Sequence, residues 1–313
     1  MRKTGYTLVT TLLAVLSVGA QQQPAGRDLS WAFPVMEGRV PAEEPGPKTV
    51  PGSTRTFELE RIENLSEPPD WFPEEHPPAP AIVRQGHGAA LACGSCHLMS
   101  GLGHPESAGL TGFTAAYIQQ QMADFKSGAR IDSSRMNAIA AEVSDEEARQ
   151  AAEWFASLAS PVGTRVIEAA MVPATFVGQG RMRFLQPGGA MEPLGNRIIT
   201  LPDDQTRARL RDPHSGFYAY VPVGSVARGK ALIETGDSGR TIACTICHGD
   251  TLRGLGNVPR LAGLHPIYAA RQLYLFKDGS RNGVDAQLMK KAVANLTDED
   301  IVAISAYLGS LAP

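Results

Sequence analysis

The chain has 313 residues, of which 43% are hydrophobic, and it carries a formal net charge of −3 at neutral pH. This length is sufficient for two domains and a connecting segment. A mildly acidic chain is a poor partner for nucleic acid, whose binding proteins carry an excess of Lys and Arg, whereas it can dock against a basic patch on another protein.

Residues 1–20 have the features of a cleavable signal peptide. Arg2 and Lys3 give a basic start, an apolar run covers residues 6–18, and compact residues lead up to Ala20. The alternative is an uncleaved membrane anchor, but the run is short for a membrane span. No later stretch is apolar enough to cross a bilayer. We therefore expect cleavage near Ala20 and an exported protein that does not span the membrane.

Residues 21–80 are rich in Pro, Glu and Gly. This composition predicts an extended N-terminal arm with little regular structure. The arm contains Trp31, Trp71 and Phe72. We expect these apolar side chains to pin it to the surfaces of the domains.

Two pentapeptides, at residues 93–97 and 244–248, share the pattern Cys-x-x-Cys-His. This pattern is the attachment signature of c-type haem. The two thiols add to the haem vinyl groups, and the neighbouring imidazole binds the iron. All four cysteines of the chain lie in these motifs. We therefore expect two covalently bound haem c groups, attached in the periplasm through Cys93, Cys96, Cys244 and Cys247, with His97 and His248 as the proximal iron ligands.

An internal repeat surrounds the motifs and covers about residues 82–160 and 226–313. A shift of 151 residues superimposes the two motifs together with several later positions. The paired positions include Tyr117 and Tyr268, Gln121 and Gln272, Phe125 and Phe276, Lys126 and Lys277, and Arg130 and Arg281. Each copy is therefore predicted to form one haem-binding domain.

Helical patterns recur in both copies. One helix is expected over about residues 114–127, and its counterpart over 266–277. A final helix begins at a Ser-Asp-Glu-Glu capping box at 144–147, and at the related Thr-Asp-Glu-Asp at 297–300. Beyond both caps, apolar residues recur at helical spacing.

The linker segment 161–225 separates the copies and contains no cysteine. Short β-like runs at 181–185, 197–201 and 217–221 are interrupted by Pro and Gly, which predicts a small irregular or β-rich subdomain. The expected fold is thus mainly α-helical, with an extended arm and an irregular, β-containing linker.

One methionine in each copy is the candidate for the sixth iron ligand. Met136 follows His97 by 39 residues and Met289 follows His248 by 41 residues, each in a predicted loop before the final helix. The alternative is a methionine that packs in the core, which we prefer for Met122 because Leu273 occupies its place in the second copy. Ligation by both methionines would close both irons to substrates, as electron transfer requires.

Other polar groups are expected around the haems. The Pro259 carbonyl is placed to accept from His248 Nδ1, and a backbone acceptor near Ala108 is expected to do the same for His97. Arg130 and Arg281 either pair with haem propionates or are solvated charges at helix ends. Five histidines are unrepeated and are interpreted as surface or supporting residues: His76, His87, His104, His214 and His265.

With these motifs in place, each copy resembles a class I cytochrome c domain of the cytochrome c4-like subgroup. The shared pattern in the second copy is Leu261-Ala262-Gly263, Tyr268 to Gln272, Phe276 to Arg281, Met289 and Thr297-Asp298-Glu299. The resemblance implies two compact α-helical haem domains that carry single electrons in the periplasm. The longer layout is similar to di-haem cytochromes that serve as subunits or acceptors of periplasmic dehydrogenases.

The sequence therefore predicts a periplasmic carrier that takes single electrons from a dehydrogenase or a quinol-oxidising complex and passes them to an oxidase or another cytochrome. The alternative is a haem enzyme, either a di-haem peroxidase or a thiosulfate-oxidising cytochrome, with one open axial site. A third hypothesis is a haem-based gas sensor or a structural member of a larger assembly.

Overall fold

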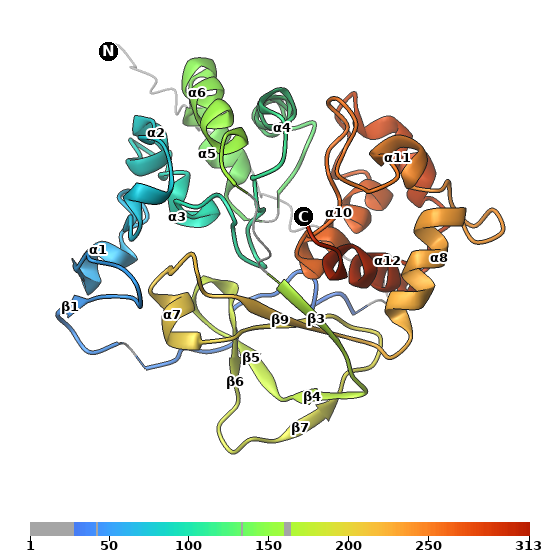
Figure 1. Ribbon diagram of the computed structural model, residues 1–313, viewed down its shortest axis with the longest axis horizontal. Coiled ribbons are helices and arrows are strands. Elements are labelled where there is room, and N and C mark those ends of the chain that lie inside the picture. Colours follow the sequence, from blue (N-terminus) through green and yellow to red (C-terminus); the bar gives the residue numbers. More distant parts are fainter. Residues whose placement is uncertain (1–27, 42, 133, 160–163) are drawn as a thin grey trace, which may run out of the picture.

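The computed structural model describes residues 28–41, 43–132, 134–159 and 164–313. The predicted signal peptide, residues 1–20, lies outside the described residues. Two groups of helices, one from each copy of the repeat, lie above a layer of short strands (Figure 1). None of the helices in the described ranges is long and apolar enough to cross a membrane.

The first group of helices carries the first Cys-x-x-Cys-His motif. Thr114 caps α4 by accepting from the Tyr117 amide, and Ser144 and Glu147 form the predicted capping box of α6. The helices of this group are α2 (Ala81–Arg84), α3 (Gly94–His97), α4 (Ala115–Ser127), α5 (Met136–Glu142) and α6 (Asp145–Ala156).

The second group repeats this order around the second motif. Thr297 and Asp300 form a complete capping box at the start of the last helix, so both predicted caps are confirmed. The helices are α8 (Ser225–Thr235), α9 (Thr245–His248), α10 (Pro266–Asp278), α11 (Ala286–Val293) and α12 (Asp298–Ser310). Most of α12 is buried, because it packs against α8, α10 and the strand layer.

The strand layer forms between the two copies. Its elements are β3 (Thr164–Glu168), β4 (Met171–Pro173), β5 (Thr175–Val177), η2 (Gln179–Arg181), β6 (Arg183–Leu185), β7 (Met191–Pro193), β8 (Ile199–Pro202), α7 (Gln205–Arg209) and β9 (Phe217–Val221). The β-like runs predicted from the sequence correspond to β6, β8 and β9. In the sheet β3-β9-β8, β9 pairs in parallel with β3 and antiparallel with β8.

The segment predicted as an arm is mainly extended but is tightly packed. Its short elements are β1 (Pro47–Lys48), β2 (Phe57–Glu58), α1 (Leu59–Glu63) and η1 (Pro73–Glu75). Trp31 is 3% exposed and meets Tyr274 of the second copy edge-on. Trp71 and Phe72 are buried with Leu210, which follows α7. These aromatic residues therefore pin the segment to both the second copy and the linker, as expected.

Candidate haem sites

Each Cys-x-x-Cys-His motif forms one short helical turn, α3 in the first copy and α9 in the second. Beyond each turn a backbone carbonyl receives the proximal imidazole. His97 Nδ1 lies 2.8 Å from the Ala108 oxygen, and His248 Nδ1 lies 2.7 Å from the Pro259 oxygen. Because a carbonyl can only accept, Nδ1 carries the proton and Nε2 keeps its lone pair. Both predicted carbonyl contacts are confirmed, and each leaves Nε2 able to bind a metal.

Burial sets the protonation state of these groups. It lowers the pKa of both His97 and His248, which favours the neutral imidazole that binds iron. It also raises the pKa of Cys93 to about 12 and that of Cys244 to about 11. These thiols are therefore not activated nucleophiles of the kind found in catalytic cysteine sites.

An apolar hollow beside the first motif is placed where a haem attached to that motif would lie. Its volume is about 520 Å³, including the part open to solvent, and Cys93, Cys96, His97 and Met136 all line it. The chemistry of the lining fits this placement, since two thiols, an imidazole and a thioether are the groups that haem c uses.

The structure corrects the predicted setting of the two methionines. Met136 is the first residue of α5 and Met289 lies inside α11, so neither is in a loop. Helix forms in the second copy because Ala286–Val293 consists mostly of good helix formers. Both side chains are partly buried against the main apolar core.

Met122 was assigned to core packing, yet it also lines the first hollow. It lies on α4, one turn after Ile118, which lines the same hollow. The sequence could have indicated this position, because residues four apart on the predicted helix share one face, and Met122 therefore lies on the same face as Ile118. A second thioether is thus present at the first site.

Arg130 and Arg281 are only 6% and 7% exposed, so their interpretation as solvated charges is wrong. Each guanidinium lies over a phenylalanine ring of its own copy, Phe125 and Phe276 respectively. Among the described residues no carboxylate lies within ion-pair distance of either arginine, and Arg130 Nε has no hydrogen-bond partner. Two buried cations with spare donors suit an anion such as a haem propionate.

His265 is buried and is not a surface residue. Its Nδ1 lies 2.5 Å from Thr164 Oγ1 at the start of β3. The ring also meets Phe217 of β9 edge-on. This histidine therefore joins the second copy to the linker sheet and lies outside the two motifs.

Comparisons with known proteins agree with this geometry. Residues 226–312 match the model of the cytochrome c family. Cytochrome c-554(548) of Halomonas halodenitrificans is 38% identical over 88 residues, which cover 28% of this chain and 96% of that protein. The chain belongs to the cytochrome c family. It is a di-haem cytochrome with two covalently bound haem c groups, and it transfers electrons.

Two longer relatives match about three quarters of this cytochrome. Cytochrome c4 of Pseudomonas aeruginosa is 27% identical over 230 residues, which cover 72% of this chain and 87% of the relative. A thiosulfate dehydrogenase electron acceptor of Thiomonas intermedia is 27% identical over 238 residues, covering 74% of this chain and 84% of the relative.

The fold is also found in a solved structure, the thiosulfate dehydrogenase of Marichromatium purpuratum. It superimposes with a TM-score of 0.50 at 24% identity, over 74% of this chain and 39% of that chain. The predicted fold class, two class I cytochrome domains with additional segments, is confirmed. The proposed boundaries between the segments remain a prediction.

Proposed function

We propose that this cytochrome is a periplasmic carrier in which both haem irons are closed by one histidine and one methionine. Cys93 and Cys96 would hold the first haem, and His97 and Met136 would bind its iron. Cys244 and Cys247 would hold the second haem, and His248 and Met289 would bind its iron. The observation that carries the proposal is the first hollow, which Met136 lines together with the three motif residues.

Haem c supplies one-electron redox chemistry, and a His/Met pair favours a relatively high potential. The protein's own groups fix the ligands. The carbonyls of Ala108 and Pro259 orient the two imidazoles, and apolar walls keep water from the first site. Ligands that are already in place need little rearrangement when the charge of the site changes.

The contact between the two copies around Arg130 and Arg281, here called the seam, supports electron transfer from one haem to the other. Arg130 and Arg281 bind the same pair of glutamine oxygens there. We propose that these arginines also bind propionates of the two haems, which would bring the haem edges toward one seam. An electron could then be taken up at one haem and released from the other.

The partner is proposed to be a periplasmic dehydrogenase, with an oxidase or another cytochrome as acceptor. The relative from Thiomonas intermedia is named as the electron acceptor of thiosulfate dehydrogenase, which supports a dehydrogenase as donor. The aligned region leaves about a quarter of this chain unmatched. The partner of this cytochrome can therefore differ from that of the relative.

The test is a set of visible and near-infrared spectra of the mature protein, oxidised and reduced, with carbon monoxide added to the reduced form. Closed sites give a thioether-to-ferric charge-transfer band for both haems and no carbon monoxide binding. A high-spin haem that binds carbon monoxide would overturn the closed-site proposal and favour the haem-enzyme alternative. Rapid turnover of peroxide or thiosulfate would then identify the reaction.

A further inference from the structure

The two haem-attachment turns have different surroundings, although they are equivalent in the repeat. Ser95 in the first turn is 1% exposed, whereas its counterpart Ile246 in the second is 70% exposed. The first turn is covered by the N-terminal segment and by the loop after α7. Ser95 Oγ donates to the Leu65 carbonyl of that segment at 2.5 Å.

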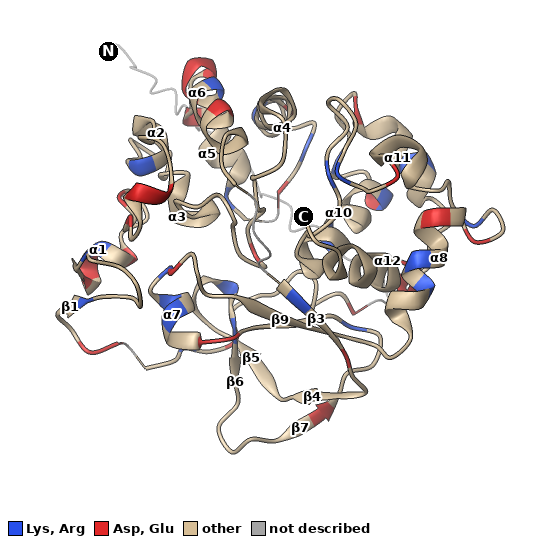
Figure 2. Cartoon of the chain, in the orientation of Figure 1, with Lys and Arg blue, Asp and Glu red and all other residues tan. Residues whose placement is uncertain are grey.

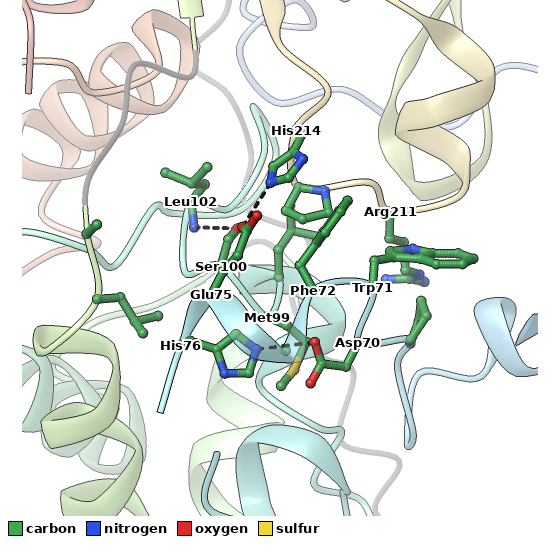
Figure 3. Close-up of a pocket in the computed structure, with 16 residues that line it drawn as sticks. Asp70, Trp71, Phe72, Glu75, His76, Met99, Ser100, Leu102, Arg211 and His214 are labelled. Atoms are coloured by element: carbon green, nitrogen blue, oxygen red, sulfur yellow. Dashed lines mark hydrogen bonds and ion pairs between the residues drawn. The ribbon is translucent and has the colours of Figure 1, made fainter. Parts of the chain in front are cut away.

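Arg211 lies at the centre of this cover. Its Nε donates to the Ile62 carbonyl at 2.9 Å, and its Nη1 donates to the Ser95 carbonyl inside the first Cys-x-x-Cys-His turn. Arg211 also lines a pocket beside this turn, together with Trp71 and Gly94 (Figure 3). One side chain therefore joins the linker, the N-terminal segment and the haem-attachment turn.

The charge of Arg211 is not neutralised by a close partner. Within the described ranges, its hydrogen bonds go to backbone carbonyls and no carboxylate lies within ion-pair distance, although Glu63 attracts it from further away. The other arginines of this region are paired, Arg207 with Asp212 at 2.7 Å and Arg209 with Glu43 at 2.8 Å. Figure 2 shows basic residues on α7 in blue. Arg211 is thus a partly buried positive charge beside this turn, without a carboxylate partner among the described residues.

Arg211 lies next to the cysteine that would bear the haem. Ser95, whose carbonyl accepts from Arg211, directly precedes Cys96 in the chain. A guanidinium at this place is close enough to act on the charge of a haem attached through Cys96.

We propose that Arg211 selectively raises the reduction potential of the first haem. This inference rests on the proposed function only in requiring two redox-active haems. Reduction removes one positive charge from the haem, so a nearby cation that is partly shielded from water favours the reduced form. The second copy has the exposed Ile246 at the equivalent place, so its haem lacks this influence.

The experiment is a spectroelectrochemical titration of the full-length holoprotein, comparing wild type with Arg211→Met and Arg211→Lys. Arg165→Met is the control, because it removes the same charge from an exposed side chain of the linker. Each step of the titration is assigned to one haem with the variants Met136→His and Met289→His, each of which should shift the reduction potential of one haem alone. A two-step, low-spin wild-type titration upholds the proposed function independently of the Arg211 result.

We expect Arg211→Met to lower the potential of the first haem only. At the wild-type midpoint, its oxidised-to-reduced ratio should rise on the order of three- to tenfold. Arg211→Lys should keep most of the wild-type potential, and Arg165→Met should move neither step. The proposal is overturned if Arg211→Met has no effect, if it moves both steps equally, or if the Met and Lys variants shift the first step alike. The last result would assign the effect to lost packing. If the Met variant folds poorly, the Lys variant still decides, because a large shift of the first step in that variant also overturns the proposal.

Discussion

Arg130 and Arg281 pair with each other across the seam between the two copies. They form an isolated antiparallel bridge, and their guanidinium groups share the oxygens of Gln121 and Gln272 at 2.7–3.1 Å. Tyr117 Oη accepts from Arg281 as well. Residues that are equivalent in the repeat thus meet at an approximate two-fold axis, where the two copies face each other.

Replacement of Arg130 by Met should weaken this seam. The change removes the two hydrogen bonds from Arg130 to the amide oxygens of Gln121 and Gln272, to which Arg281 still donates. We expect this loss to cost about 1–3 kcal/mol in the free energy of unfolding. Urea titration of the holoprotein followed by circular dichroism measures the loss. Arg149→Met is the matched control, since Arg149 lies on the exposed face of α6. An equal loss in both variants would show that the seam contributes nothing specific.

Met136→Leu should open the first iron, because leucine keeps the volume but supplies no ligand. We expect the reduced variant to bind one carbon monoxide per protein and to lose part of the charge-transfer band. Met289→Leu should do the same at the second haem. Met122→Leu is the control, since Met122 lines the same hollow as Met136. If Met122→Leu alone opened the first site, the ligand assignment would be wrong.

Ser144→Ala should destabilise the first copy by about 0.5–2 kcal/mol through loss of the N-cap. Ser144 accepts from the Glu147 amide and donates to its carboxylate at 2.8 Å. Thermal unfolding of the variant is compared with that of Ser157→Ala, at the other end of α6, where the hydroxyl bonds only to the Trp154 carbonyl. A smaller effect at Ser144 than at Ser157 would contradict the capping argument.

Acid should destabilise the fold in part through His265. Burial lowers its pKa from 6.5 to about 4, so the unfolded state binds the proton first as the pH falls. Stability is complete above pH 6.5 and decreases as the pH falls toward about 4, by up to about 3 kcal/mol for this group. His104, whose pKa burial lowers to about 3, adds to the same loss.

The measurement is the free energy of unfolding at several pH values between 4 and 7 for wild type and His265→Gln. The slope should be smaller in the variant. His87→Gln, at an exposed histidine paired with Glu147, is the comparison. Equal slopes in wild type and His265→Gln would exclude this histidine as a source of acid sensitivity.

The repeat made much of the fold predictable. Residues 114–127 and 266–277 showed helical spacing, and α4 and α10 cover Ala115–Ser127 and Pro266–Asp278. Short motifs that use local hydrogen bonds, such as the capping boxes and the carbonyl contacts of the motif histidines, were also readable. Each of these depends on residues close together in the chain.

Contacts between distant segments were not predictable. The Ser95 carbonyl and Arg211 are 116 positions apart, and no local pattern relates them. The parallel pairing of β3 with β9 was also missed, because Thr164–Glu168 was not predicted as a strand and because alternation of apolar residues identifies a strand but not its partner. The burial of His265 also followed from this sheet.

The parallel pairing of β3 and β9 has a consequence for the spacing of the two copies. Thr164 lies opposite Phe217 and Glu168 opposite Val221, so the chain leaves the linker only one strand away from where it entered. Five residues of strand advance the chain by about 17 Å. The points where the chain enters and leaves the linker are therefore held on neighbouring strands, however long the linker is. Insertions or deletions in the loops between β3 and β9 should leave the two haem-binding units in the same relative position.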